Sequence, residues 1–365
     1  MTSFLPSVSK VPLNLGADVV TLTRALCDIQ SVSGDELVIA DAVEVALRGL
    51  GYLEVLRNGD TVVARTHLGR GTRIVLAGHL DTVPVAENLP TWMTGSGEDE
   101  IVYGRGTVDM KAGLAVHLRI AAMIREPRHD LTYIFYDNEE VASHRNGLGR
   151  LAREHPDWLQ ADFAVLGEPS GQTIEGGCQG TMRIDVTVRG VAAHSARSWM
   201  GRNAIHAAGA ALDVLNRYEP RSVEVDGLLY REGLNAVGIG GGIAGNVVPD
   251  KCVVSVNFRY APDRDVAAAE RYLREVFAGF DVVVKDAAPG ARPGLTHPAA
   301  AEFIAAVGKP VAPKFGWTDV ARFSSLGIPA VNYGPGDPQL AHTAIEACPA
   351  SAIRECEYVL TRWLG

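Results

Sequence analysis

Short apolar runs alternate along the chain with amphipathic segments of helical period. Such runs are typical of buried strands, and their alternation with helices predicts an α/β sheet covered by helices. Strands are expected at 54–56, 61–66, 73–78, 131–136, 162–167 and 328–332, and helices at 35–50, 110–125 and 350–364.

From residue 180 the pattern changes to alternation of single apolar and polar residues, which predicts strands with one exposed face. Strands are expected there at 181–189, 247–259 and 282–285, with helices at 203–218 and 267–277. This order indicates a separate α+β layer inserted into the larger unit. We therefore expect one domain made of 1–179 and 289–365, with an inserted domain at 180–288.

Length and charge narrow the class of protein. A chain of 365 residues favours two domains over one. The 34 Lys and Arg against 43 Asp and Glu give a net charge of −9, which disfavours nucleic acid or an anionic membrane as partner. A local basic pocket for a small acidic ligand is compatible with this charge.

The sequence shows neither a membrane-spanning segment nor a secretory signal. No run of about 18 apolar residues exists, so no membrane span is expected. Residues 1–16 lack a basic region followed by an apolar block, so no secretory signal is expected. The five cysteines (Cys27, Cys178, Cys252, Cys348 and Cys356) form no CxxC pair and are expected to be buried thiols in the cytoplasm.

Three of the expected strands run directly into residues that bind metals or carry protons. These residues are His79 and Asp81, then Glu139 and Glu140, then Glu168. In open α/β sheets, ligands bind beyond the carboxyl ends of the strands, so we expect these side chains to converge.

Two further residues join this set. Asp109 stands in GRGTVDMKAG at the head of an expected helix, and His342 follows the last expected strand. A cluster of carboxylates and imidazoles requires positive charge, and imidazole with carboxylate suits zinc or cobalt. A pair of metals sharing one carboxylate would use all these ligands. Of the neighbours Glu139 and Glu140, one can ligate while the other takes a proton from water.

Each feature alone also has a structural explanation. A histidine near the chain end is usually a surface side chain, and an acidic pair is usually a solvated face. Asp109 fits a helix cap equally well. The joint occurrence of these residues at strand ends favours a catalytic metal site.

The motifs that carry these residues resemble those of a known family. They are GHLDTVP at 78–84, GRGTVDMKAG at 104–113, the Glu139–Glu140 pair, GEPS at 167–170 and the late His342. From about 22 to 363 the chain resembles the dinuclear zinc amidohydrolases, which include acetylornithine deacetylase, glutamate carboxypeptidases and succinyl-diaminopimelate desuccinylase. The resemblance implies a zinc-peptidase-like catalytic domain with a mixed sheet flanked by helices. It also implies an inserted ferredoxin-like domain for dimerisation or as a lid, and hence a homodimer.

The resemblance assigns the metal ligands position by position. It implies two zinc ions per subunit, with cobalt also suited to one site. His79 and Glu168 would bind one ion, Glu140 and His342 the other, and Asp109 would bridge them.

The same resemblance assigns three further roles. Glu139 would act as general base, and Asp81 would orient His79. His194 would reach the active site of a neighbouring subunit and stabilise the oxyanion. Without the resemblance, His194 reads as a surface histidine after a strand.

Substrate choice rests on a narrower resemblance. The segments CQGTMR, FYDNEEVASHRNGLG and FGWTDVARFSSLGIPAVNYGPGDPQLAH look like the actinobacterial type of succinyl-diaminopimelate desuccinylase. This implies hydrolysis of N-succinyl-LL-2,6-diaminopimelate to succinate and LL-2,6-diaminopimelate. Arg259 matches an arginine that binds a substrate carboxylate, and further polar contacts would come from Asn246, Gly180, Thr181, Gly316 and Thr318.

Two departures stand out against that pattern. Cys178 and Gln179 occupy positions where many desuccinylases carry arginines, so anion recognition is redistributed or the acyl group differs. After His342 the chain reads Thr-Ala-Ile-Glu346, where family members often carry a charged residue before the acidic one, and no role is assigned to this difference.

Three alternatives remain open. A related N-acyl-amino-acid deacylase of the acetylornithine deacetylase kind, or a small carboxypeptidase, would use the same metal centre. A nucleotide-binding protein would use the GxGxxG pattern at 240–245, but Pro249 soon after it opposes the helix that this motif needs. A catalytically inactive scaffold would have lost ligands or the base, and none is missing.

Overall fold

The computed structural model describes residues 12–365, and the chain divides into two compact units. Unit 1 comprises the chain up to Gly176 together with Gly294–Ala312 and Arg322–Gly365, and unit 2 comprises Gly177–Pro293 and Pro313–Ala321. The expected insertion at 180–288 lies within unit 2, which also includes 313–321. Of the segment in which no secretory signal is expected, 1–11 lies outside the described residues.

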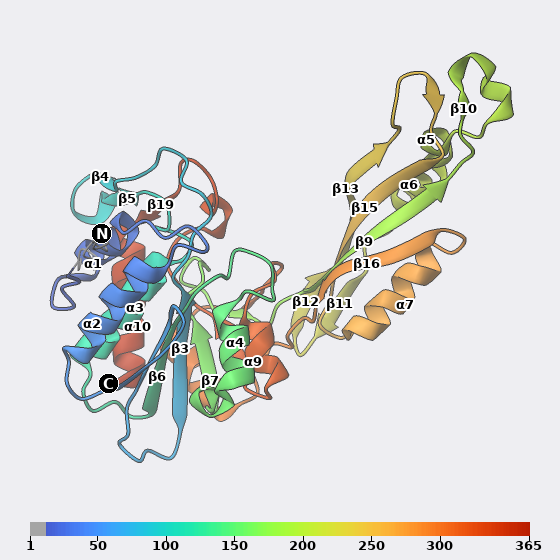
Figure 1. Cartoon of the computed structure of the whole chain (residues 1–365). Helices are drawn as coiled ribbons and strands as arrows, with labels where there is room; N and C mark the ends of the chain where they lie inside the picture. Colours follow the sequence, from blue (N-terminus) through green and yellow to red (C-terminus); the bar gives the residue numbers. More distant parts are fainter. Residues whose placement is uncertain (1–11) are drawn as a thin grey trace. The chain divides into compact units, whose positions relative to one another are not determined.

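Unit 1 is built on an eight-stranded mixed sheet in the order β1-β2-β6-β3-β7-β18-β8-β17 (Figure 1). The neighbouring strands β6, β3, β7 and β18 run parallel, whereas β1, β2 and β8 pair antiparallel with their neighbours. The strands are β1 (Glu54–Asn58), β2 (Thr61–Arg65), β3 (Arg73–His79), β6 (Asp130–Tyr136), β7 (Phe163–Leu166), β8 (Glu175–Gly176), β17 (Ala312–Pro313) and β18 (Ala330–Asn332). A three-stranded sheet contains β4 (Trp92–Thr94), β5 (Ile101–Tyr103) and β19 (Ala347–Pro349).

Helices cover the sheet of unit 1 because its strands are apolar on both faces. Ile74 and Leu76 of β3 belong to a core shared with α1, α2, α3, α8 and α10, while Val75 and Ile134 are fully buried as well. The helices are α1 (Val19–Asp28), α2 (Leu37–Arg48), α3 (Lys111–Met123), α4 (Gly147–Glu154), α8 (Pro298–Val307), α9 (Val320–Ser325) and α10 (Ala350–Leu364), with short 3₁₀ turns η1 (Gly97–Asp99), η2 (Pro156–Leu159) and η4 (Pro338–Leu340).

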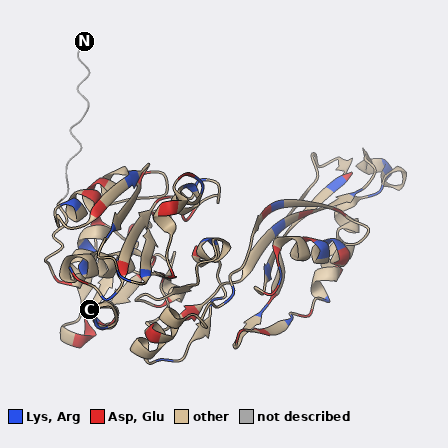
Figure 2. Cartoon of the chain, turned by 90° about the horizontal axis from the view of Figure 1, so that it is seen from below, with Lys and Arg blue, Asp and Glu red and all other residues tan. Residues whose placement is uncertain are grey.

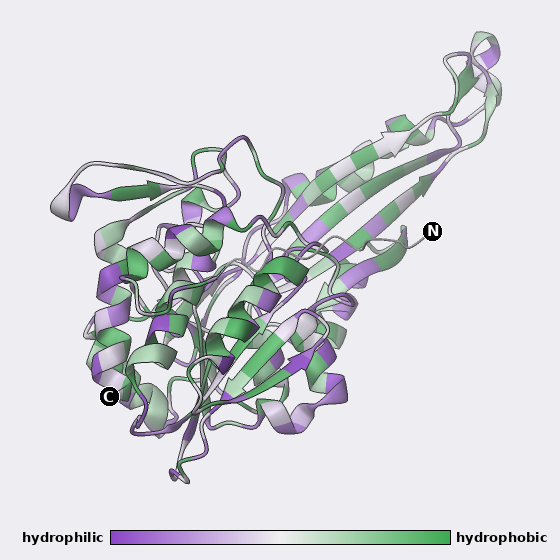
Figure 3. Cartoon of the chain, turned by 60° about the vertical axis from the view of Figure 1, so that its left-hand side comes forward, coloured by the Kyte–Doolittle hydropathy of each residue, from purple (hydrophilic) through white to green (hydrophobic). Residues whose placement is uncertain are grey.

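Unit 2 has the βαββαβ order of a ferredoxin-like fold, with an antiparallel sheet in the order β13-β15-β9-β16. Its elements are β9 (Gly180–Arg189), β10 (Ala193–His194), η3 (Ser195–Met200), α5 (Ala204–Ala207), α6 (Gly209–Asn216), β11 (Ser222–Val225), β12 (Leu228–Arg231), β13 (Gly233–Gly241), β14 (Val247–Val248), β15 (Lys251–Tyr260), α7 (Val266–Val276) and β16 (Asp281–Ala288). Buried and partly exposed residues alternate along β9 and β15, and the hydropathy bands of Figure 3 follow that alternation. The buried set packs against α5, α6 and α7. The expected α/β class with an α+β insertion is confirmed.

Two expected elements differ in detail. The strand expected at 247–259 is divided into β14 and β15 at Pro249 and Asp250, because proline has no N–H for a ladder bond. The helix expected at 203–218 consists of two short helices, α5 and α6. The glycine-rich stretch at 240–245 ends β13 and leads into β14, so the helix that a nucleotide-binding turn requires does not follow it.

The distribution of charged residues and the state of the cysteines agree with what the sequence predicts. Basic and acidic residues are interspersed over both units (Figure 2). All five cysteines lie in the described part of the chain and are buried free thiols. Among residues 12–365, the helices are too short or too polar to cross a membrane.

Candidate metal centre

Three neighbouring parallel strands of unit 1 end at one edge of the sheet. β3 lies between β6 and β7, and His79 at its end is opposite Tyr136 at the end of β6. The turns after these strands carry Glu139, Glu140 and Glu168. His79 forms one group with Glu139 and Glu140, and its potential ligand atoms lie within 4.8 Å of theirs. The convergence expected from the strand ends is therefore present.

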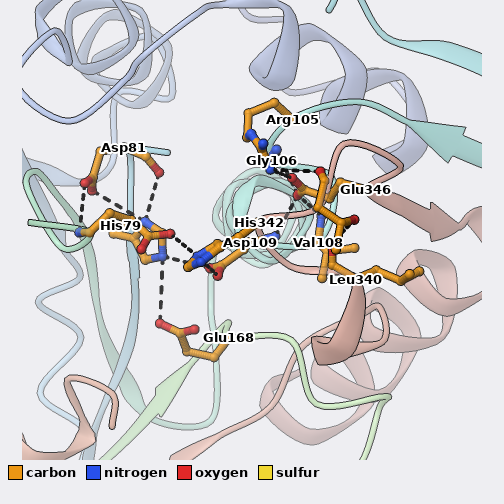
Figure 4. Close-up of polar contacts among 12 residues, drawn as sticks. His79, Asp81, Arg105, Gly106, Val108, Asp109, Glu168, Leu340, His342 and Glu346 are labelled. Atoms are coloured by element: carbon orange, nitrogen blue, oxygen red, sulfur yellow. Dashed lines mark hydrogen bonds and ion pairs between the residues drawn. The ribbon is translucent and has the colours of Figure 1, made fainter. Parts of the chain in front are cut away.

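Asp109 lies between two imidazoles (Figure 4). Its Oδ1 is 3.0 Å from Nε2 of His79, and its Oδ2 is 3.2 Å from Nε2 of His342. Glu168 Oε1 is 3.9 Å from the same nitrogen of His79, and Glu140 Oε1 is 2.8 Å from that of His342. Two donor groups thus share Asp109 through its two oxygens.

The donor set fits a dinuclear metal centre. Imidazole nitrogens and carboxylate oxygens without thiolate suit catalytic zinc or cobalt, and within each group the ligand atoms lie within 4.8 Å of one another. Nδ1 of His79 is 3.0 Å from the Asp81 carbonyl oxygen, which can only accept, so Nδ1 donates to it. Nε2 faces Asp109 and Glu168, where it holds a proton or, once that proton is displaced, a metal ion.

The carboxylates gathered around His79 and His342 also require a positive charge among them. Burial lowers the pKa of His79, but hydrogen bonds and charges from Asp109 and Asp81 outweigh it and raise the pKa well above its usual value. Hydrogen bonds to Asp109 and Glu140 raise the pKa of His342 to about 10. Burial raises the pKa of Asp109, yet its hydrogen bonds with His342 and His79 hold the pKa well below the ordinary range. The carboxylates are stabilised only beside cations, whether imidazolium or metal.

Asp81 holds the turn that carries the two glutamates. Its Oδ1 accepts the N–H of Glu139 and its Oδ2 that of Glu140, both at 3.0 Å, and Oδ2 also accepts the Ser33 hydroxyl at 2.6 Å. The Asp81 carboxylate is 3.5 Å from Nδ1 of His79, farther than its own carbonyl oxygen. Asp81 therefore orients His79 through its backbone, while its side chain fixes the Glu139–Glu140 turn.

Sequence reasoning missed two residues that support this turn. One is Ser33, described above. The other is Glu36, whose Oε1 accepts the N–H of Asn138 at 3.0 Å while Oε2 accepts that of Gly34 at 2.8 Å. Asn138 has a φ of 59°, in the left-handed region, so its backbone depends on such a bond. Neither Ser33 nor Glu36 lies in a pattern that distinguishes it from an ordinary loop residue.

The substrate-binding residues expected from the resemblance all lie in unit 2. Arg259 of β15 is half-buried and opposite Thr181 of β9, and burial lowers the pKa of the guanidinium. Thr181 Oγ1 accepts a hydrogen bond from Asn257 at 3.2 Å. A Cβ at Gly180 would lie 2.2 Å from the Tyr260 ring, so packing requires glycine there. Of the remaining candidates, Asn246 and Gly316 are exposed and Thr318 is buried.

His194 is exposed at the end of β10, opposite Val247. Its Nδ1 accepts the N–H of Ala196 at 3.1 Å. In the neutral ring the proton is therefore on Nε2, which makes that nitrogen a hydrogen-bond donor. Such a donor has the polarity that an oxyanion requires.

Comparison with known proteins gives consistent results. The model of peptidase family M20/M25/M40 matches residues 75–365. A protein of Mycobacterium tuberculosis assigned as succinyl-diaminopimelate desuccinylase is 55% identical over 356 residues, which cover 97% of this chain and 99% of that protein. The succinyl-diaminopimelate desuccinylase of Corynebacterium glutamicum is 49% identical over 367 residues, which cover 98% of each chain.

Solved structures share the fold at lower identity. A tripeptidase from Staphylococcus aureus has a TM-score of 0.78 at 22% identity and covers 96% of this chain and 98% of its own. A dinuclear metal-binding peptidase from Bacillus subtilis has a TM-score of 0.69 at 17% identity, covering 94% of this chain and 96% of its own. These likenesses confirm the fold class.

Proposed function

Because this chain belongs to peptidase family M20/M25/M40, we propose that its substrate is N-succinyl-LL-2,6-diaminopimelate, which it hydrolyses to succinate and LL-2,6-diaminopimelate. The chain is a metal-dependent amidohydrolase. Its succinyl specificity is supported by relatives of that name at 55% and 49% identity over almost the whole length. The metal-dependent hydrolysis is supported chiefly by the position of Asp109, whose two oxygens each lie beside a different histidine.

We assign five residues to the metals, taken to be zinc at both sites, with cobalt also suited to one. His79 and Glu168 would hold one ion, Glu140 and His342 the other, and Asp109 both. When bound, such ions polarise the amide carbonyl and lower the pKa of water.

Glu139 is the proposed general base. Its backbone is fixed by Asp81, and its carboxylate lies in the group formed with His79 and Glu140. Glu139 takes the proton of the attacking water and later delivers it to the leaving amine, so one carboxylate serves both steps. Its neighbour Glu140 contacts His342 instead, which gives the two glutamates different roles.

Arg259 is the proposed anchor for a substrate carboxylate. The substrate carries three carboxylates, and a planar guanidinium binds such a group through two parallel hydrogen bonds. Arg259 lies on the central strand β15 of the unit 2 sheet, beside Thr181 on β9. Partial burial strengthens its interaction with an anion, since less water competes.

We further propose a homodimer formed through unit 2. β13 is an edge strand, and its residues 235–241 are exposed, including Val237 at 60% and Ile239 at 56%. An exposed apolar edge strand is a template for pairing with another chain. In such a dimer, Nε2 of His194 would donate a hydrogen bond to the oxyanion in the partner's site. The reaction is assigned to the cytoplasm, where five free thiols persist.

Amine release tests the substrate assignment. The metal-loaded protein is given N-succinyl-LL-2,6-diaminopimelate, N-acetylornithine and a dipeptide in parallel. Fast release from the first alone is expected. A clear preference for N-acetylornithine would instead indicate a deacylase, and a preference for the dipeptide a small peptidase, with the same metal chemistry in each case.

Mixed subunits test the dimer assignment. His194→Ala and Glu139→Ala proteins are each expected to be nearly inactive. Dimers that combine the two should regain part of the activity, because one site then has both an intact Glu139 and a partner's intact histidine. No recovery on mixing would place the action of His194 within one chain.

A further inference from the structure

The carboxylate of Glu346 is fully buried among donors from one loop of unit 1 (Figure 4). Its Oε1 accepts the backbone N–H groups of Gly106 at 2.9 Å, Val108 at 2.9 Å and Asp109 at 3.2 Å. Its Oε2 is 2.7 Å from Nη1 of Arg105, whose side chain is 3% exposed. One buried ion pair therefore fixes the loop that carries Asp109.

Arg105 extends the same network to two other segments. Its Nε donates to the carbonyl oxygen of Pro84 at 3.1 Å, and its Nη1 donates to that of Thr343 at 3.3 Å. Thr343 directly follows His342. The ion pair thus connects the loop after β3, the Asp109 loop and the His342 loop.

The His342 backbone depends on such support. Its φ of 64° lies in the left-handed region, which a non-glycine residue occupies only when its surroundings hold it there. Thr343 is bonded on both sides, because its N–H and hydroxyl reach the carbonyl oxygen of Leu340 while its own carbonyl accepts from Arg105. The backbone oxygen of Glu346 also accepts the N–H of Gly104 at 3.0 Å, which ties the two loops together a second time.

We propose that Glu346, acting with Arg105, is a positioning residue that sets the separation of Asp109 and His342. It would thereby determine the affinity of the Asp109–Glu140–His342 group for its metal. This inference rests on the metal centre of the proposed function. Glu346 itself binds no metal, because both of its oxygens are taken up by N–H donors.

A glutamine at 346 would break this arrangement without changing its size. An amide presents an NH₂ group to Arg105 in place of an acceptor oxygen, or turns it towards the three backbone N–H groups. In either orientation donors face donors. An aspartate keeps the charge but is one methylene shorter, so it cannot reach Arg105 and all three N–H groups together.

A purely structural role predicts a different result from a positioning role. Loss of fold stability would weaken both metal sites together. Loss of positioning would act on the group that contains His342, because Glu346 and Arg105 tie Asp109 to Thr343. The group of His79 and Glu168 also contains Asp109, but Asp109 is its one ligand that Glu346 holds, and the Asp81 carbonyl holds the His79 ring independently. That group should therefore weaken less.

The test is zinc titration of the metal-free, full-length protein by calorimetry, combined with thermal unfolding. The wild type should bind two ions. Glu346→Gln should bind one ion almost as tightly as the wild type and the other about 10- to 100-fold more weakly. The control is Glu100→Gln in the same unit. The half-buried Glu100 carboxylate pairs with the exposed Arg354 at 2.7 Å, and this variant should match the wild type.

Other outcomes distinguish a failure of the positioning role of Glu346 from a failure of the proposed metal centre. Equal weakening of both sites, or no weakening, in Glu346→Gln would overturn the positioning role. Failure of the wild type to bind two ions would overturn the proposed metal centre instead. If Glu346→Gln does not fold, Glu346→Asp is measured in its place, with the same selective loss expected and the same results contradicting it.

Discussion

The two units prepare their candidate residues in different ways. In unit 1 the side chains expected to carry the reaction are held by buried groups from other segments, such as Asp81 and Glu36, which are 0% and 1% exposed. In unit 2, His194 and Asn246 are exposed, and Arg259 lies half-buried on an open sheet. With the proposed roles, the metal ligands and the general base are set before substrate arrives, whereas the oxyanion donor and the substrate contacts of unit 2 gain their order from what that unit binds.

Removal of the base should produce the largest effect, confined to the chemistry of unit 1. Glu139→Gln leaves the backbone bond to Asp81 in place, so metal content should be unchanged while kcat falls by about 10³-fold or more. Turnover and elemental analysis check this. Glu140→Gln should behave differently and lose metal. If Glu139→Ala kept more than a small fraction of turnover, the assignment of the base would fail.

Alanine substitution of one glycine in each unit compares how tightly the two units are packed at these positions. A Cβ at Gly113 of α3 would lie 2.1 Å from the carbonyl oxygen of Gly167, next to Glu168, whereas one at Gly240 of β13 meets nothing within 4 Å. Gly113→Ala should lower the free energy of unfolding by about 1–3 kcal/mol. Gly240→Ala should stay within about 0.5 kcal/mol of the wild type. Equal effects in urea unfolding would remove the contrast between the units.

Arg259→Lys tests recognition in unit 2. A lysine keeps the charge but loses the paired hydrogen bonds, so KM should rise about 10-fold or more while kcat and metal content change little. The control is Arg183→Lys on the exposed part of β9, which should leave KM unchanged. A fall in kcat at constant KM would show instead that Arg259 acts on the reaction step.

A buried histidine in the core of unit 1 gives an effect that is absent at neutral pH and develops only in acid. Burial lowers the pKa of His117 to about 3, so the native ring stays neutral while the unfolded ring takes up a proton below its ordinary pKa of 6.5. Its contribution to stability is thus complete above pH 6.5 and is lost as pH falls towards 3.

His117→Leu should therefore flatten the fall of the free energy of unfolding between pH 6 and pH 4. The slope should decrease by up to about 1.4 kcal/mol per pH unit. His117→Gln, which is polar but does not titrate, should show the same flatter slope. An unchanged slope in both variants would mean that the native ring already accepts protons in this range.

The strands and helices of unit 1 could be predicted because each is marked by a pattern within its own segment of the sequence. An apolar run such as that of β3 is readable in one segment, and His79 stands where it ends. Ser33 and Glu36 could not be found, since their partners lie far away in sequence. Ser33 donates its hydroxyl to the Asp81 carboxylate, 48 residues on, and Glu36 accepts the backbone N–H of Asn138, 102 residues on. Glu346 was noticed only for its place after His342, because a partner such as Arg105 is identified by the fold alone.

The central claim is that Asp109 lies between two metal ions. Anomalous diffraction from crystals of the zinc-loaded protein, collected on both sides of the zinc absorption edge, tests it most directly. We predict two anomalous peaks flanking Asp109, one bound by His79 and Glu168 and the other by Glu140 and His342. A single peak, or peaks that do not contact Asp109, would contradict the account.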